Sequence, residues 1–103
     1  MTVVWLNGAL LARDEARISP ADRGFTLGDG LFETMRAVGG QVLHLPRHMA
    51  RLASGGGVLG MPVPQVGVVE EAATALLQAC GLQNAVLRLS VARGEGPRGL
   101  LPP

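Results

Sequence analysis

The sequence contains no lysine and no tyrosine, and Cys80 is its single cysteine. A disulfide needs two thiols, so no bridge can form within the chain. This cysteine usage is typical of a reducing compartment, and we predict a cytoplasmic location. The lack of lysine excludes any chemistry that depends on a side-chain amine of this chain. The lack of tyrosine likewise removes every phenol from a ligand site.

Long hydrophobic runs and an excess of one charge are also missing. Pro62 and Pro64 interrupt the most apolar stretch, so no segment is expected to span a bilayer, and no cationic apolar leader is visible. Nine arginines balance eight acids, which argues against nucleic acid or membrane partners. With 48% hydrophobic and 17% charged residues, the 103-residue chain is predicted to be one globular domain with a modest core.

The stretch from Asp22 to Leu52 carries the strongest pattern. A loop punctuated by glycines leads into a strand over residues 31–38, in which Phe32, Thr34 and Arg36 share one face. Gly39-Gly40 predicts a two-residue hairpin turn, followed by a returning strand over residues 41–45. Pro46 is suited to the first turn of a helix, which we expect to continue to residue 59 despite three glycines.

The remaining segments predict an α+β fold. Asn7-Gly8 separates two apolar runs and indicates a hairpin near the N-terminus. Apolar residues three and four apart predict a helix over residues 68–80, with Glu70 and Glu71 in its first turn and Gly81 ending it. Residues 85–92 alternate like a strand. We therefore predict an antiparallel sheet with two helices packed on one side.

Three motifs in this order resemble a known family. They are D-R-G-x-x-x-G-D-G-x-F-E-T-x-R from Asp22, H-x-x-R-L from His48, and R-G-x-x-x-R from Arg93. Together they resemble the N-terminal domain of the fold-type IV pyridoxal-phosphate enzymes, that is, the class IV aminotransferases. This family includes D-amino-acid and branched-chain aminotransferases and aminodeoxychorismate lyases. The resemblance implies the corresponding D-amino-acid aminotransferase-like fold.

The resemblance also explains the missing lysine. Enzymes of this family hold pyridoxal 5'-phosphate as a Schiff base on a lysine of their second domain. The expected division is therefore an N-terminal domain over residues 1–99 and the start of an interdomain linker over residues 100–103, with the lysine-bearing domain outside this chain. We expect the 103 residues to contain no catalytic residue and to be inactive alone, within an enzyme that forms homodimers.

The resemblance assigns roles to six residues. Arg51 stands where the family contacts the cofactor phosphate, and we predict that it lies on the concave side that displays Phe32 and Arg36. The substrate-pocket candidates are Phe32, Thr34, Arg36, Arg93 and Arg98. Arg88 either borders the cofactor site or faces solvent, and His48 is expected to support the site rather than react. No spacing indicates a metal site.

The reaction remains open between members of the family. The R-G-x-G-x-R-G spacing is closest to 4-amino-4-deoxychorismate lyases, which act in 4-aminobenzoate and folate synthesis. D-amino-acid aminotransferases tend to carry tyrosine where Phe32 stands, which argues against that activity. A D-amino-acid or branched-chain aminotransferase is the alternative, and a domain that serves only folding and dimer contact is another.

Overall fold

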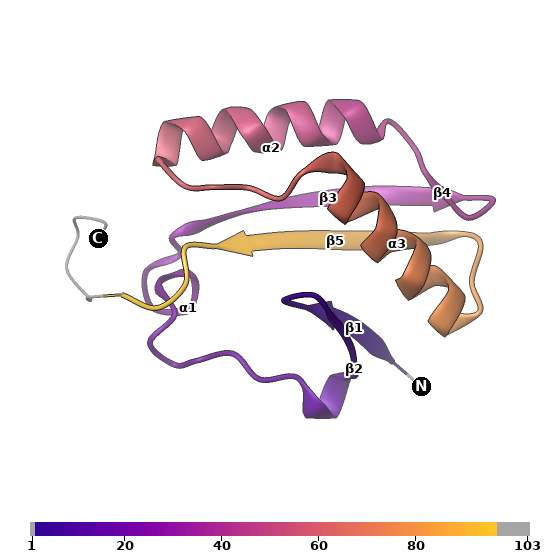
Figure 1. The fold of residues 1–103 in the computed structure, drawn as a ribbon, viewed down its shortest axis with the longest axis horizontal. Helices are drawn as coiled ribbons and strands as arrows, with labels where there is room; N and C mark the ends of the chain where they lie inside the picture. Colours follow the sequence, from indigo (N-terminus) through magenta and orange to yellow (C-terminus); the bar gives the residue numbers. More distant parts are fainter. Residues whose placement is uncertain (1, 97–103) are drawn as a thin grey trace.

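The computed structural model describes residues 2–96, and its largest element is a three-stranded antiparallel sheet in the order β4-β3-β5 (Figure 1). β3 (Gly30–Val38) and β5 (Ala85–Ala92) are paired over eight successive residues. Gly39 and Gly40, with φ of 60° and 81°, form the predicted two-residue turn after β3. The alternation predicted for both long strands is confirmed.

The returning strand is shorter than predicted. Only β4 (Gln41–Val42) pairs with β3, at Ala37 and Val38, whereas the sequence suggested a strand over residues 41–45. The reason is that the chain must leave the sheet to start a helix at Leu45. His44 adopts a left-handed conformation immediately before it, with φ of 56°. The edge of β3 between Gly30 and Met35 therefore has no strand partner within the described residues.

One face of the sheet carries both long helices, as predicted. α2 (Leu45–Leu59) lies along β3, and α3 (Val66–Cys80) crosses beside it (Figure 1). Side chains of β3, α2 and α3 form the buried cluster between them: Met35, Leu45, Met49, Leu52 and Val69. Because Met35 belongs to this cluster, the odd-numbered residues of β3 face the helices and the even-numbered ones face away.

α2 continues through three consecutive glycines, as the sequence suggested. Gly56 is buried, and its carbonyl accepts a hydrogen bond from the N–H of Met61 at 2.9 Å. A Cβ on Gly56 would lie 2.7 Å from Cγ1 of Val63 and 2.8 Å from the carbonyl oxygen of Met61. A Cβ on Gly57 would meet nothing within 4 Å. Close packing of the segment after α2 thus explains Gly56, but not Gly57.

We predict opposite effects for alanine at these two neighbouring positions. Gly56→Ala should lower the free energy of unfolding by about 1–3 kcal/mol, because the added methyl group overlaps backbone that cannot move away freely. Gly57→Ala should raise it by about 0.5–1 kcal/mol, because alanine is the better helix former at an open position. Urea denaturation of both variants measures the difference. Equal effects at the two positions would contradict the packing described here.

α3 begins two residues earlier than predicted. The sequence suggested a start at Val68, whereas the helix starts at Val66, directly after the loop that contains Pro62 and Pro64. Glu70 and Glu71 therefore lie beyond the first turn, and the predicted interaction with the N-terminal end of the helix dipole is wrong. The C-terminal end is as expected, because Gly81 adopts a left-handed conformation with φ of 65°.

The N-terminal part of the chain adds a hairpin and a short helix. β1 (Val3–Leu6) and β2 (Ala9–Ala12) pair antiparallel across the predicted Asn7-Gly8 turn, and a 3₁₀ turn, η1 (Arg13–Glu15), follows. α1 (Arg23–Leu27) lies where β3 begins and β5 ends (Figure 1). The carboxylate of Asp22 caps it by accepting a hydrogen bond from the Gly24 N–H at 2.7 Å. The whole is the predicted α+β fold.

Candidate functional site

A buried carboxylate on β3 holds two side chains of α2. Glu33, whose side chain is 8% exposed, accepts hydrogen bonds from Nε and Nη2 of Arg51 at 2.9 and 2.8 Å. Nδ1 of His48 lies 2.7 Å from Oε1 of the same carboxylate. The Arg51 side chain is 71% exposed. The guanidinium therefore has one edge against Glu33 and presents the rest of its donors to solvent.

Local structure explains why these three residues meet. Glu33 is an odd-numbered residue of β3 and faces the helices, while His48 and Arg51 lie one turn apart on α2. The sequence predicted that His48 supports the site, but it gave Glu33 no role. The available signal was an acid at a position flanked by Leu31 and Met35 on the apolar face of the strand, where a carboxylate needs a partner.

Electrostatics follows from this geometry. The hydrogen bonds from Arg51, and then that from His48, lower the pKa of Glu33 from 4.5 to about 2. The same pair raises the pKa of Arg51 above its usual value. Glu33 is therefore ionised at neutral pH, and an ionised carboxylate only accepts, so Nδ1 of His48 carries the proton of their shared bond. The cluster can offer an anion the outward donors of Arg51.

The lowered pKa predicts a pH dependence of stability. A carboxylate that binds protons more weakly in the folded state stabilises the protein above its unfolded pKa, and this contribution is lost as the pH falls. The Glu33 contribution should be complete above about pH 4.5 and should disappear toward pH 2. Thermal unfolding midpoints over this range measure it. Glu33→Gln should give a flatter dependence, and an unchanged slope would contradict the ion pair.

The opposite face of the sheet displays the predicted substrate-pocket residues. Phe32, Thr34 and Arg36 are all exposed, and Phe32 is 59% exposed. From β5, Arg88 places its guanidinium carbon 4.4 Å from the centre of the Phe32 ring. The prediction that these side chains share one open face is confirmed. Their contact with a substrate stays a prediction, and Arg88 belongs to this face rather than to the Arg51 cluster.

The structure does not bring Arg51 onto the concave side that displays Phe32 and Arg36, so that prediction is wrong. α2 packs on the face that contains Glu33, whereas Phe32 and Arg36 point to the other side of β3. The physical reason is the two-residue period of a strand, which gives neighbouring residues opposite directions. A single ligand could contact both Arg51 and the face that carries Phe32 only if it lay across the unpaired edge of β3.

Arg93 lies in a buried ion pair, and its predicted contact with a substrate stays a prediction. Its side chain is 11% exposed, its Nε donates to Oδ2 of Asp29 at 2.6 Å, and its Nη2 donates to the Leu59 carbonyl at 2.6 Å. Nε of Arg23 donates to the same Asp29 oxygen at 2.9 Å. The hydrogen bonds from both arginines lower the pKa of Asp29, and the bond from Arg93 has the larger effect. Arg93 thus joins the ends of β5 and α2. Arg98 lies outside the described residues.

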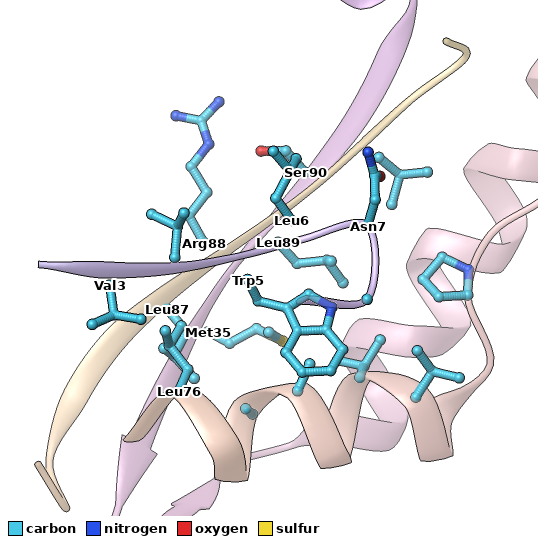
Figure 2. Close-up of a pocket in the computed structure, with 18 of the residues that line it drawn as sticks. Val3, Trp5, Leu6, Asn7, Met35, Leu76, Leu87, Arg88, Leu89 and Ser90 are labelled. Carbon is cyan, nitrogen blue, oxygen red and sulfur yellow. The ribbon is translucent and has the colours of Figure 1, made fainter. Parts of the chain in front are cut away.

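An apolar cavity of about 470 Å³ lies between β1, β5 and α3 (Figure 2). Figure 2 shows the indole of Trp5 between β1 and α3, with Met35 and Leu76 nearby. Arg88 and Ser90 point away from these apolar groups in the same view. A phosphate needs charged or N–H donors, so this cavity does not suit one. Among residues 2–96, neither Arg51 nor the candidates Phe32, Thr34, Arg36 and Arg93 line it.

Two further properties concern the described part of the chain. Within residues 2–96, no three histidine, cysteine, aspartate or glutamate residues are grouped in a way that would hold a metal ion. Across the same residues, the helices are too short or too polar to cross a membrane.

Comparison with known proteins identifies the family. Residues 30–103 match the family model of amino-transferase class IV, which is well over half of the chain. The arrangement of β3, α2, α3 and β5 lies within this matched region. The chain therefore belongs to the class IV aminotransferases, as its motifs suggested.

Individual relatives span several activities. The chain is 33% identical to D-alanine aminotransferase of Staphylococcus haemolyticus over 95% of its length, and 36% identical to the putative branched-chain-amino-acid aminotransferase of Methanocaldococcus jannaschii over 96%. It covers 35% of each of these proteins. The chain thus spans about a third of the length of its curated relatives.

Solved structures agree with the fold. The 4-amino-4-deoxychorismate lyase of Pseudomonas aeruginosa matches with a TM-score of 0.71 and 41% identity, over 85% of this chain and 32% of that one. A branched-chain amino acid aminotransferase from T.th., complexed with N-(5'-phosphopyridoxyl)-L-glutamate, matches with a TM-score of 0.84 and 25% identity, over 96% of this chain and 35% of that one.

Proposed function

We propose that this chain forms the N-terminal part of a pyridoxal-phosphate enzyme and supplies Arg51 to the cofactor phosphate. The observation that carries the proposal is a guanidinium held by a buried carboxylate and 71% exposed on its other sides. A phosphate dianion is bound best by fixed, charge-assisted donors of this kind. Family membership supports the cofactor, since a solved relative was crystallised with a phosphopyridoxyl compound.

The rest of the cofactor site must come from outside this chain. The sequence has no lysine to bind the cofactor covalently. We propose that the intact protein continues beyond residues 100–103, an interdomain linker, into a domain that supplies this lysine. When bound, the cofactor supplies an electron sink that makes a substrate proton acidic. The residues of this chain then bind and orient phosphate and substrate, and the 103 residues alone are inactive.

We propose that the side chains that bind the substrate lie across the unpaired edge of β3 from Arg51. Phe32, Thr34 and Arg36 display an apolar ring, a hydroxyl and a guanidinium on the exposed face, opposite Arg51. An arginine on this face suits a substrate carboxylate, which every amino acid and aminodeoxychorismate carries. Arg93 contributes through the loop that it anchors, and Arg98 of the same motif is the proposed carboxylate ligand from that loop.

For the reaction, we propose the lyase reaction on 4-amino-4-deoxychorismate. Two observations favour it: the 41% identity to the Pseudomonas aeruginosa lyase, and phenylalanine rather than tyrosine at position 32. Amino transfer from D-amino acids or branched-chain amino acids to a 2-oxo acid is the second candidate, because curated relatives with those names are 33% and 36% identical. The proposed enzyme is a cytoplasmic homodimer.

Product analysis of the intact protein tests this choice. The protein is incubated with pyridoxal 5'-phosphate and 4-amino-4-deoxychorismate, and separately with a 2-oxo acid and either D-alanine or a branched-chain amino acid. Release of 4-aminobenzoate without amino transfer supports the lyase. Amino transfer alone replaces it with the second candidate. The 103-residue chain serves as the control and should turn over neither substrate.

A domain for folding and dimer contact is a further candidate. Phe25 is 76% exposed, Val86 71% and Ile18 67%, so apolar surface lies open on α1, on the loop before it and on β5. Light scattering of the 103-residue chain distinguishes the possibilities. Self-association into dimers supports this candidate, and a monomer at high concentration excludes it.

A further inference from the structure

We propose that Glu33 is a positioning residue for phosphate binding: it fixes the Arg51 guanidinium with its outward edge available to the ligand, and His48 fixes Glu33. The proposal rests on the proposed function, because it takes Arg51 as the phosphate ligand. It adds a residue that touches no ligand and acts through another side chain.

The hydrogen bonds define which edge of the guanidinium is left. Glu33 accepts hydrogen bonds from Nε of Arg51, which lies 3.2 Å from Oε1 and 2.9 Å from Oε2. It also accepts one from Nη2, which lies 2.8 Å from Oε1. Both nitrogens belong to one edge of the planar group. Within residues 2–96, none of the hydrogen bonds of Arg51 uses Nη1. The edge formed by Nη1 and the second hydrogen of Nη2 therefore remains for a second oxyanion, in the parallel geometry that phosphate accepts.

Burial shows which partner fixes the other. The Glu33 side chain is 8% exposed and sits on a strand paired to β5, whereas the Arg51 side chain is 71% exposed on a helix surface. An exposed arginine without a partner samples many rotamers, and ordering it on binding costs binding free energy. Glu33 orders Arg51 before the ligand arrives, so the ligand is spared this cost.

Stability alone gives a weak reason for a carboxylate at this position. Burying a carboxylate carries a desolvation cost, which the hydrogen bonds from Arg51 and His48 must first offset. The neighbouring positions on the same face, Leu31 and Met35, are apolar and contact the core, so packing alone does not call for a carboxylate between them. His48, 16% exposed, donates a second hydrogen bond to Oε1 and so removes rotational freedom from the carboxylate itself. This arrangement favours orientation over packing as the role of Glu33.

The test compares two ligands that differ only in the phosphate. Dissociation constants for pyridoxal 5'-phosphate and pyridoxal are measured by calorimetry on the intact protein and its variants. Arg51→Ala should weaken binding of the phosphorylated ligand by about 10- to 100-fold and leave pyridoxal unchanged. Glu33→Gln should weaken only the phosphorylated ligand, by about three- to tenfold, through lost order. The double variant should match Arg51→Ala, and Arg47→Ala, at an exposed arginine one turn earlier, should change neither.

The outcomes separate the two proposals. If Arg51→Ala leaves the preference for the phosphorylated ligand intact, the proposed function fails. If Arg51→Ala removes it but Glu33→Gln does not, or if Glu33→Gln tightens phosphate binding by removing a negative charge, the positioning role is overturned. Equal weakening of both ligands indicates only structural damage and also overturns it. Should Glu33→Gln not fold, Glu33→Asp keeps the charge, shortens the reach and should show the same selective loss.

Discussion

Replacing Leu52 by alanine is expected to lower the free energy of unfolding by about 3–4 kcal/mol. Leu52 is 2% exposed and has the largest fully buried side chain among residues 2–96. It lies between β3 and α3, in the cluster that contains Met35 and Val69. Truncation removes apolar contacts and leaves a cavity that neighbours anchored on three elements cannot fill. Small domains have only about 5–15 kcal/mol of stability, so the loss is a large fraction.

Chemical denaturation measures this effect, and α2 offers a matched control. Val58, on the same helix, is 84% exposed, and Val58→Ala should change stability by less than about 0.5 kcal/mol. A loss below about 1 kcal/mol for Leu52→Ala would mean that the helix layer is not packed as described.

Asp29→Asn should lower the thermal unfolding midpoint by at least about 10 °C, because it leaves two arginines near a neutral amide. The side chains of Arg23 and Arg93 are 3% and 11% exposed, and both donate to the same oxygen of Asp29. Breaking a buried, hydrogen-bonded ion pair by removing one member is strongly destabilising. The substitution also loosens the junction where α1, β3, β5 and the end of α2 meet.

Asp14→Asn is the matched control for Asp29→Asn. The side chain of Asp14 is 95% exposed, and its Oδ1 lies 4.0 Å from Nε of Arg13, whose side chain is 72% exposed. Its removal should shift the midpoint by no more than about 2 °C, as expected for a surface ion pair. Similar shifts for the two variants would show that Asp29 is not the counter-charge of a buried cluster.

Short-range chemistry made much of the fold predictable. Gly39-Gly40 and Asn7-Gly8 specify hairpin turns, Pro46 specifies a helix start, and Gly81 specifies a helix end. All four are found where the sequence suggested. Each is a local requirement of the backbone that involves few distant residues. The predicted end of β4 was wrong. It depends on where α2 must start in space, and the residues near Leu43 do not encode that position.

The candidate site was predictable in its residues but not in its arrangement. Alternation placed Glu33 and Phe32 on opposite faces, yet only packing decides which face α2 covers, and so on which side Arg51 lies. Asp29 and Arg93 are 64 positions apart in sequence. Their contact depends on the pairing of β3 with β5 and on the end of α2, so the sequence near Arg93 did not predict this buried ion pair.

The cavity between β1 and α3 has an optical consequence. Trp5 is the chain's one tryptophan, and tyrosine is absent, so intrinsic emission under 295 nm excitation would come from the hairpin alone. Circular dichroism at 222 nm is dominated by α2 and α3. Comparing the two signals during unfolding therefore distinguishes detachment of the β1–β2 hairpin from α3 from melting of the helices, and the protein needs no added label.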